Sequence, residues 1–142
     1  MSTLGQDLRL FTLDEAQRML PLVRSIVRGI LEDHAVLQEK VGELRTRRRE
    51  AARRPYREAR EAGTGLTAEI EELTARVNDA IRELEALGVE FKGYELGLVD
   101  FPARRGDEVV YLCWKHDEER IGWWHTLEGG FAGRQQLDEE IS

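Results

Sequence analysis

The sequence predicts an α+β fold in which a long antiparallel helical hairpin, coiled-coil-like in pattern, precedes a small three-stranded antiparallel β-sheet. Two observations carry this prediction. Heptad patterns of apolar residues fill positions 12–88, and short segments rich in β-branched and aromatic residues fill positions 89–136. A chain of 142 residues suits one domain. We therefore expect a single domain over residues 1–142, with the two helices connected through about residues 48–65.

A capping box marks the start of the first helix. The Thr12 side chain can accept a hydrogen bond from the backbone N–H of Glu15, and the Glu15 side chain can return one to Thr12. Apolar residues, and His34 at one position, then recur in alternating steps of three and four, which is the heptad repeat of a coiled coil. Pro21 lies inside this pattern and should bend or restart the helix near residues 17–21. The pattern runs through Leu13, Ala16, Leu20, Val23, Val27, Ile30, His34, Leu37, Val41 and Leu44.

A second heptad pattern begins after Gly63 and Gly65 and stops at Gly88, a residue type suited to end a helix. Two heptad helices in succession most economically form an antiparallel hairpin. Since the first helix is the longer, its N-terminal part needs a further partner, which can be the C-terminal region or a second subunit. The second pattern runs through Leu66, Ile70, Leu73, Val77, Ala80, Leu84 and Leu87.

The segment after the helices predicts three strands, within residues 93–101, at 109–114 and at 121–125. Residues 89–92 form a short extended piece before them, and residues 127–134 form a glycine-rich loop after them. The turns between the strands are rich in charged residues and glycine, as turns usually are.

Side chains alternate between the two faces of a strand, so the register decides which residues meet. A turn centred on residues 117–118 places Val110 opposite His125. Asp100, if it also lies opposite Val110, then shares a face with His125. Cys113 points to the other face. Both faces are largely apolar or aromatic and each needs cover, one from the first helix and the other from the glycine-rich loop or a second subunit.

Asp100 and His125 are the candidate catalytic residues. Asp100 can orient His125, which can act as a base or as a metal ligand. Arg134, with loop amides such as those of Gly130 and Gly133, can hold a carboxylate or phosphate, so a small anionic ligand is a candidate. The structural alternative is a histidine that caps a strand end and an aspartate that opens a turn.

No metal site is favoured, and any cofactor is unknown. His125 and Glu128 are weak ligand candidates, because no pair of residues has the close spacing of a zinc motif and Cys113 is expected to point away. Cys113 is the single cysteine, which fits a reducing compartment. No apolar stretch approaches the ~18 residues that a membrane span needs. We therefore expect a cytoplasmic protein with no membrane partner.

Charge is distributed unevenly along the chain. The net charge is −7, yet residues 45–60 hold eight Arg and two Glu, a net of +6 that leaves −13 for the rest. This Arg-rich tip can attract polyanions, but the acidic remainder opposes them. Nucleic acid is therefore not favoured as a partner.

Five motifs are distinctive when taken together. They are the Phe-Thr-x-x-Glu-Ala helix start at 11–16, Gly-Leu-Val-Asp-Phe-Pro at 97–102, Tyr-Leu-Cys-Trp at 111–114, Trp-His at 124–125 and Gly-Phe-Ala-Gly-Arg at 130–134. In these motifs the chain resembles an uncharacterised bacterial family, the domain-of-unknown-function family 2203. The resemblance covers nearly the whole chain, although Gln136 stands where the family often has proline. It supports the fold and implies no particular chemistry.

Three classes of function follow from the sequence. We favour an interaction module, a homo-oligomer that uses the overhang of the first helix and the second apolar face of the sheet. The first alternative is a small-molecule or metal-dependent enzyme with a site at the end of the sheet. The second alternative is polyanion binding through residues 45–60. The residues of the enzymatic alternative are Asp100, His125, Glu128 and Arg134.

Overall fold

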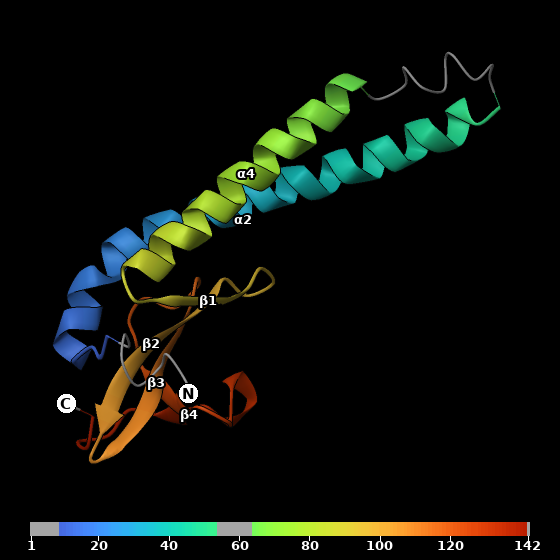
Figure 1. Cartoon of the computed structure of the whole chain (residues 1–142). Helices are drawn as coiled ribbons and strands as arrows, with labels where there is room; N and C mark the ends of the chain where they lie inside the picture. Colours follow the sequence, from blue (N-terminus) through green and yellow to red (C-terminus); the bar gives the residue numbers. More distant parts are fainter. Residues whose placement is uncertain (1–8, 54–63, 142) are drawn as a thin grey trace, which may run out of the picture.

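A computed structural model describes residues 9–53 and 64–141 of the chain. In this part of the chain two helices are followed by a five-stranded sheet, which confirms the α+β class (Figure 1). The helices are α2 at Leu13–Ala51 and α4 at Thr64–Ala86. The strands are β1 at Glu90–Gly93, β2 at Leu98–Arg105, β3 at Glu108–Lys115, β4 at Trp123–Thr126 and β5 at Gln135–Gln136, and a short 3₁₀ helix, η1, spans Phe131–Gly133.

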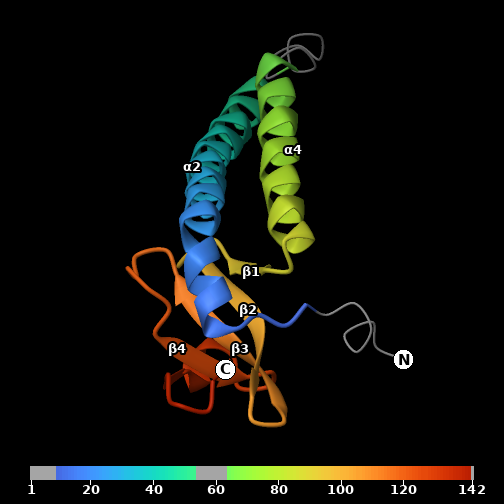
Figure 2. The ribbon, with the colours of Figure 1, turned by 90° about the vertical axis from the view of Figure 1, so that its left-hand side faces the viewer.

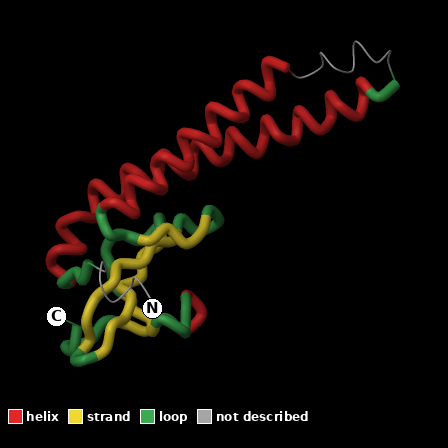
Figure 3. Tube along the Cα trace, viewed as in Figure 1, coloured by secondary structure: helices red, strands yellow, loops and turns green. Residues whose placement is uncertain are grey.

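The two helices lie side by side and run in opposite directions (Figures 1 and 2). The connection predicted at 48–65 is too wide, because α2 continues to Ala51 and α4 begins at Thr64. Residues 54–63 of that prediction lie outside the described residues. Beyond the sheet the two helices extend as an arm, shown at the upper right of Figure 3. The facing side chains of the arm are mostly half-buried, and they include Leu37, Val41, Leu44, Ile70 and Leu73.

The start of α2 agrees with its sequence signal. The backbone N–H of Glu15 donates to the Thr12 hydroxyl at 3.1 Å, and the Thr12 N–H donates to the Glu15 carboxylate at 2.8 Å, so the capping box is confirmed. Pro21 lies inside the continuous helix α2, so of the two predicted outcomes, a bend or a restart, the restart is wrong. Leu20 and Val23, on either side of Pro21, are buried in the core and hold this turn of the helix in place.

The N-terminal half of α2 packs on the sheet. Its seam residues share one core with the strands, and the Gln17 amide exchanges two hydrogen bonds of 3.0 Å with the backbone of Ile121. The sheet is therefore the further partner that the longer helix needs, and the overhang gives no reason for a second subunit. The helix residues in this core are Ala16, Leu20, Val23, Val27 and Ile30.

The antiparallel sheet has five strands in the order β1-β2-β3-β4-β5, where three were predicted. The extended piece at 89–92 pairs with β2 and becomes β1, while residues 135–136 pair with β4. β2 also continues through Pro102, where a turn was predicted. Pro102 fits because its carbonyl accepts the Phe11 N–H at 2.7 Å on the side away from β3, so the missing N–H is not needed for pairing with β3.

Gly106 sets the register between β2 and β3. It occupies a two-residue turn with φ of 60°, a conformation that favours glycine. This tight turn places Asp100 opposite Cys113, whereas the sequence interpretation placed Asp100 opposite Val110. The predicted register is therefore wrong by three residues.

The register between β3 and β4 is wrong by one residue, because Tyr111 rather than Val110 lies opposite His125. Both errors are odd numbers, and each odd slip exchanges the faces of a strand. Asp100 and His125 consequently share a face as predicted. Cys113, which was expected on the opposite face, lies with them.

The two faces of the sheet therefore differ in chemistry. The face toward the helices is apolar, with Val99, Phe101, Ala103, Val110, Leu112 and Trp114 buried in the core. The opposite face, which we call the polar face, carries Asp100, Tyr111, Cys113 and His125. The prediction of two apolar faces is thus wrong. Of the two covers expected for this second face, the glycine-rich loop or a second subunit, the second is not required, because Asp100, Cys113 and His125 are already buried in the single chain.

Candidate functional site

Three different chemical groups meet on the polar face. They are the carboxyl of Asp100 from β2, the thiol of Cys113 from β3 and the imidazole of His125 from β4, and one donor atom of each lies within 4.8 Å of the others. Asp100 and His125 are each 2% exposed, and Cys113 is fully buried. We call these residues the Asp–Cys–His cluster. Since they come from three adjacent strands, the sheet register alone brings them together.

Both ring nitrogens of His125 have a partner. Nδ1 lies 2.7 Å from the backbone carbonyl oxygen of Thr126, and Nε2 lies 3.0 Å from Oδ1 of Asp100. A carbonyl oxygen only accepts hydrogen bonds, so Nδ1 carries a hydrogen and donates it. A neutral ring then presents the Nε2 lone pair to the Asp100 carboxyl. The contact between Nε2 and Oδ1 therefore requires a proton or another cation between the two atoms.

Burial dominates the acid–base properties of the cluster. It raises the pKa of the Asp100 carboxyl above its usual value, and the nearby His125 opposes part of that rise. Burial also raises the pKa of Cys113 to about 12, and the negative charge of the nearby Asp100 carboxyl adds to this shift. Cys113 is therefore a protonated thiol at neutral pH and not a ready nucleophile.

Tyr111 flanks the cluster. Its ring centroid lies 5.4 Å from that of His125, and its hydroxyl donates to Glu90 at 2.7 Å. Lys92 lies 3.0 Å from the other Glu90 oxygen and 4.9 Å from the Tyr111 ring. Burial and the bond to Glu90 raise the pKa of Tyr111, so its phenol stays protonated. This second set of polar groups borders the cluster on the side of β1.

Arg134 is already paired with a carboxylate. One guanidinium nitrogen donates to both Glu118 oxygens at 2.9 Å, and the two side chains are only 12% and 17% exposed. The guanidinium also lies 4.7 Å from the Trp123 ring and 4.8 Å from the Phe131 ring. Its Nε is buried and has no hydrogen-bond partner among the described residues. The cation that was predicted to hold an anion is therefore neutralised within the chain.

The glycine-rich loop also bonds to itself. The Gly129 N–H donates to the Thr126 hydroxyl at 2.9 Å, and the Gly133 N–H donates to the Gly130 carbonyl at 3.1 Å. Among the described residues, these amides bond within the loop, while the Arg134 guanidinium bonds to Glu118. An anion site made by Arg134, Gly130 and Gly133 remains a prediction from the sequence.

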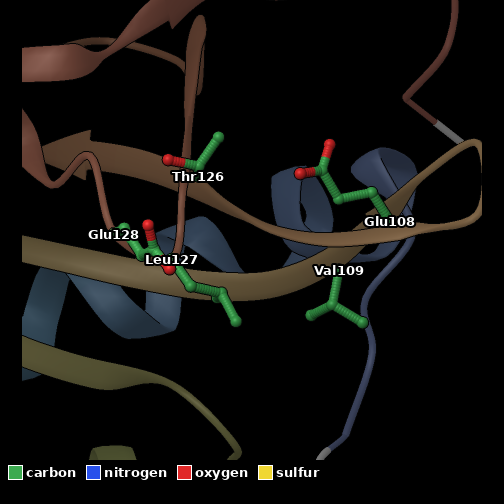
Figure 4. Close-up of a pocket in the computed structure, with 5 residues that line it drawn as sticks. All are labelled: Glu108, Val109, Thr126, Leu127 and Glu128. Carbon is green, nitrogen blue, oxygen red and sulfur yellow. The ribbon is translucent and has the colours of Figure 1, made fainter.

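Glu128 lies in a different place from the cluster. Together with Glu108, Val109, Thr126 and Leu127 it lines a groove of about 440 Å³ at the end of the sheet (Figure 4). Within the described part of the chain no hydrogen bond or ion pair joins Glu128 to His125 or Asp100. The structure thus joins two of the four residues of the predicted site, Asp100 and His125, in a direct contact. Among the described residues Arg134 bonds to Glu118 instead, and Glu128 lines the groove.

Cys113, Tyr111 and Glu118 were missed as members of this region. Each ligand-type residue of the cluster lies on a different strand, so no short sequence motif contains two of them. One signal was present in the sequence: Gly106-Asp107 is a dipeptide suited to a tight hairpin turn. A turn centred there gives the observed register and places Cys113 beside Asp100.

Fold and site together define a class: an α+β protein whose sheet is covered by a helix on one face and buries a carboxyl–thiol–imidazole cluster on the other. The chain belongs to the family described as "Uncharacterized conserved protein (DUF2203)", whose model matches residues 9–137. No curated protein and no solved structure matches the chain. Neither helix that the structure describes has an apolar stretch able to cross a bilayer.

Proposed function

We propose that this protein is ligand-dependent and that its ligand binds at the Asp–Cys–His cluster. One observation carries the proposal, the 3.0 Å contact between His125 Nε2 and Asp100 Oδ1 in side chains that are almost fully buried. This belongs to the small-molecule or metal-dependent class of function expected from the sequence. The ligand either takes the place of the proton between His125 Nε2 and Asp100 Oδ1 or forms a hydrogen bond with these two groups.

The energetic cost of the cluster supports a functional role. Moving ionisable groups out of water costs several kcal/mol per ion, and even a well-paired buried pair adds little net stability (about 0 or less against apolar replacements). The helix-facing side demonstrates that these same strands can bury apolar side chains. Groups with shifted pKa values, such as Asp100 and Cys113, concentrate at functional sites.

The contacts favour a cation or a hydrogen-bonding ligand over an anion. Two basic groups act on the cluster electrostatically, and both are already paired, Arg134 with Glu118 and Lys92 with Glu90. An anion would have to displace one of these carboxylates. A small anionic ligand therefore has less support than it had from the sequence alone.

Native mass spectrometry of the full-length protein tests this proposal. We expect the wild-type protein to carry an added mass that Asp100→Asn and His125→Asn lose. Glu128→Gln, which changes a carboxylate in the separate groove, serves as the matched control and should keep the added mass. If none of the four proteins carries a bound species, the proposal of a ligand-dependent function is wrong.

A second candidate is the interaction module, and a specific observation supports it. Among the described residues, no further helix or strand lies beside the arm. The side chains that face each other in the arm are mostly half-buried, and Val36 on α2 is 38% exposed. A homo-oligomer that uses this arm should dissociate when Val36 is replaced by Glu. A monomer at every concentration in the same native mass spectra would exclude this candidate.

Polyanion binding through residues 45–60 is the third candidate and the weakest. Residues 54–60 lie outside the described residues, and Arg47 is paired with Glu43 at 2.6 Å. We expect at most weak, salt-sensitive binding of nucleic acid, lost on replacing Arg47, Arg48 and Arg49 by Ala.

The single buried thiol suits a reducing compartment, so we propose that the protein is cytoplasmic.

A further inference from the structure

We propose that Asp100, Cys113 and His125 bind one divalent transition-metal ion of the zinc class, with one ligand atom from each of three adjacent strands. The inference rests on the proposed function, because it names the ligand of the same cluster. It reverses the sequence-based expectation that no metal site is favoured. That expectation assumed that Cys113 points away from His125, and the register places the two on one face.

The orientation of His125 is that of a metal ligand. Histidines that bind a metal through one ring nitrogen usually donate the other N–H to a backbone carbonyl or a carboxylate, which fixes the tautomer and the ring plane. The 2.7 Å bond from Nδ1 to the Thr126 carbonyl does this for His125. It leaves Nε2 as the donor atom and directs it at the Asp100 carboxylate, the second proposed ligand.

The distances fit a tetrahedral ion after small side-chain movements. With metal–ligand bonds of about 2.0–2.3 Å, two ligand atoms of a tetrahedral zinc site lie roughly 3.2–3.8 Å apart. Nε2 and Oδ1 are 3.0 Å apart, and all three donor atoms lie within 4.8 Å of one another. Movements of about an ångström at each donor atom would bring the set to this geometry.

Donor type and charge select the kind of metal. An imidazole, a thiolate and a carboxylate together suit Zn²⁺ or Co²⁺, whereas Mg²⁺ and Ca²⁺ prefer oxygen donors alone. A dication with one thiolate and one carboxylate gives a complex of zero net charge. That neutrality suits a site where Asp100 and His125 are each 2% exposed and Cys113 is fully buried.

Three protein ligands leave a fourth position. Structural zinc sites normally use four protein ligands, while catalytic sites use three and keep the last position for water or substrate. The described residues offer three donors of the required kinds in one group. The ligand count therefore leaves the fourth position to a water molecule or a small ligand.

Cobalt titration of the chelator-treated, full-length protein tests this inference. Binding of Co²⁺ should saturate at one ion per chain, with a thiolate-to-cobalt charge-transfer band and the visible bands of tetrahedral cobalt. Cys113→Ser should lose the charge-transfer band. Asp100→Asn and His125→Asn should weaken binding by at least about 100-fold, because loss of an outer-shell partner alone costs 10–100-fold. His34→Gln changes a histidine outside the cluster and should bind as the wild type does.

The outcomes separate the metal from the proposed function. Wild-type protein that binds Co²⁺ without a thiolate-to-cobalt charge-transfer band, or that binds no Co²⁺ or Zn²⁺, overturns the metal site. If native mass spectrometry then shows an organic species that depends on Asp100 and His125, the ligand-dependent function stands and only the metal assignment falls. If neither species is found, both fall. Near-ultraviolet circular dichroism of the tryptophans checks that each variant is folded, and the wild-type titration decides the matter even if a variant is not.

Discussion

The two faces of the sheet are buried to a similar degree, but one buries apolar side chains and the other buries polar side chains that pair with each other. Phe101, Leu112 and Trp114 are fully buried on the helix-facing side and pack with apolar residues of α2. The two buried polar side chains of the described residues, Asp100 and His125, both lie on the polar face and are satisfied by pairing with each other. The same strands supply both faces, so strand propensity does not explain the difference. Burial in this protein therefore marks two things, a packed core and a polar cluster held away from water.

The largest effect is expected on the helix-facing side. Phe101→Ala should lower the free energy of unfolding by about 3–5 kcal/mol, because it leaves a cavity in a packed core. Phe101 is fully buried and meets the Phe11 ring edge-on at a centroid distance of 5.3 Å. Urea unfolding followed by tryptophan fluorescence measures the change. Leu96→Ala, at a residue that is 41% exposed, should stay within about 0.5 kcal/mol and is the control. Equal effects of the two substitutions would mean that this face is not the core.

The polar face should respond in a way that an apolar core cannot. His125→Leu should cost about 3 kcal/mol, because Asp100 is left buried without its partner. The double variant Asp100→Val with His125→Leu should recover most of that loss, since two apolar groups need no pairing. Urea unfolding in the presence of a chelator measures both variants without any bound metal. A double variant that is less stable than His125→Leu would show that the pair is needed for folding rather than for function.

A smaller effect is expected at the half-buried ion pair between Glu118 and Arg134. Glu118→Gln keeps the shape of the side chain but leaves the charge of Arg134, which is largely buried beside the Trp123 and Phe131 rings, without its partner. This should cost about 2 kcal/mol. Thermal unfolding measures this change. Glu128→Gln, at an exposed carboxylate with no ion pair among the described residues, should change little. Similar melting of the two variants would show that the Glu118–Arg134 pair does not stabilise the loop before β5.

The contrast between the faces also explains which features were predictable from the sequence. Local signals gave correct results: the capping box of Thr12 and Glu15 starts α2, and the heptad positions Val23, Val27 and Ile30 are buried. These signals depend on residues close in the chain, whose geometry a helix fixes. The seam also continued into the arm, where the side chains are mostly half-buried because only two helices meet there.

The content of the polar face was harder to predict because it depends on register. A slip of one residue moves every side chain of a strand to the other face. Two odd slips cancelled for Asp100 and His125, which were placed together through incorrect pairings, but not for Cys113. Side chains that cross a strand, such as Tyr111 reaching Glu90, cannot be read from alternation alone. The cluster therefore needed three-dimensional coordinates, although the hairpin turn at Gly106 was visible in the sequence.

The smallest expected effect concerns how α2 is placed over the helix-facing side. Thr12→Ala removes the hydroxyl that accepts the Glu15 N–H and should cost about 1 kcal/mol. The hydrogen bond from the Thr12 N–H lowers the pKa of Glu15 below its ordinary value of 4.5. A carboxylate whose folded pKa is lowered stabilises the fold above its unfolded pKa, and this contribution is lost as the pH falls through the folded pKa. Glu15→Gln can keep a hydrogen bond to Thr12 but cannot titrate, so between neutral pH and about pH 3 its urea midpoint should fall less than that of the wild type. An equal fall in both proteins would show that the stability contributed by this capping box does not depend on pH.

The cobalt spectrum of Thr12→Ala should match that of the wild type, because the capping box anchors α2 on one face and the proposed metal ligands lie on the other. A changed spectrum would show that the two faces are coupled through the sheet.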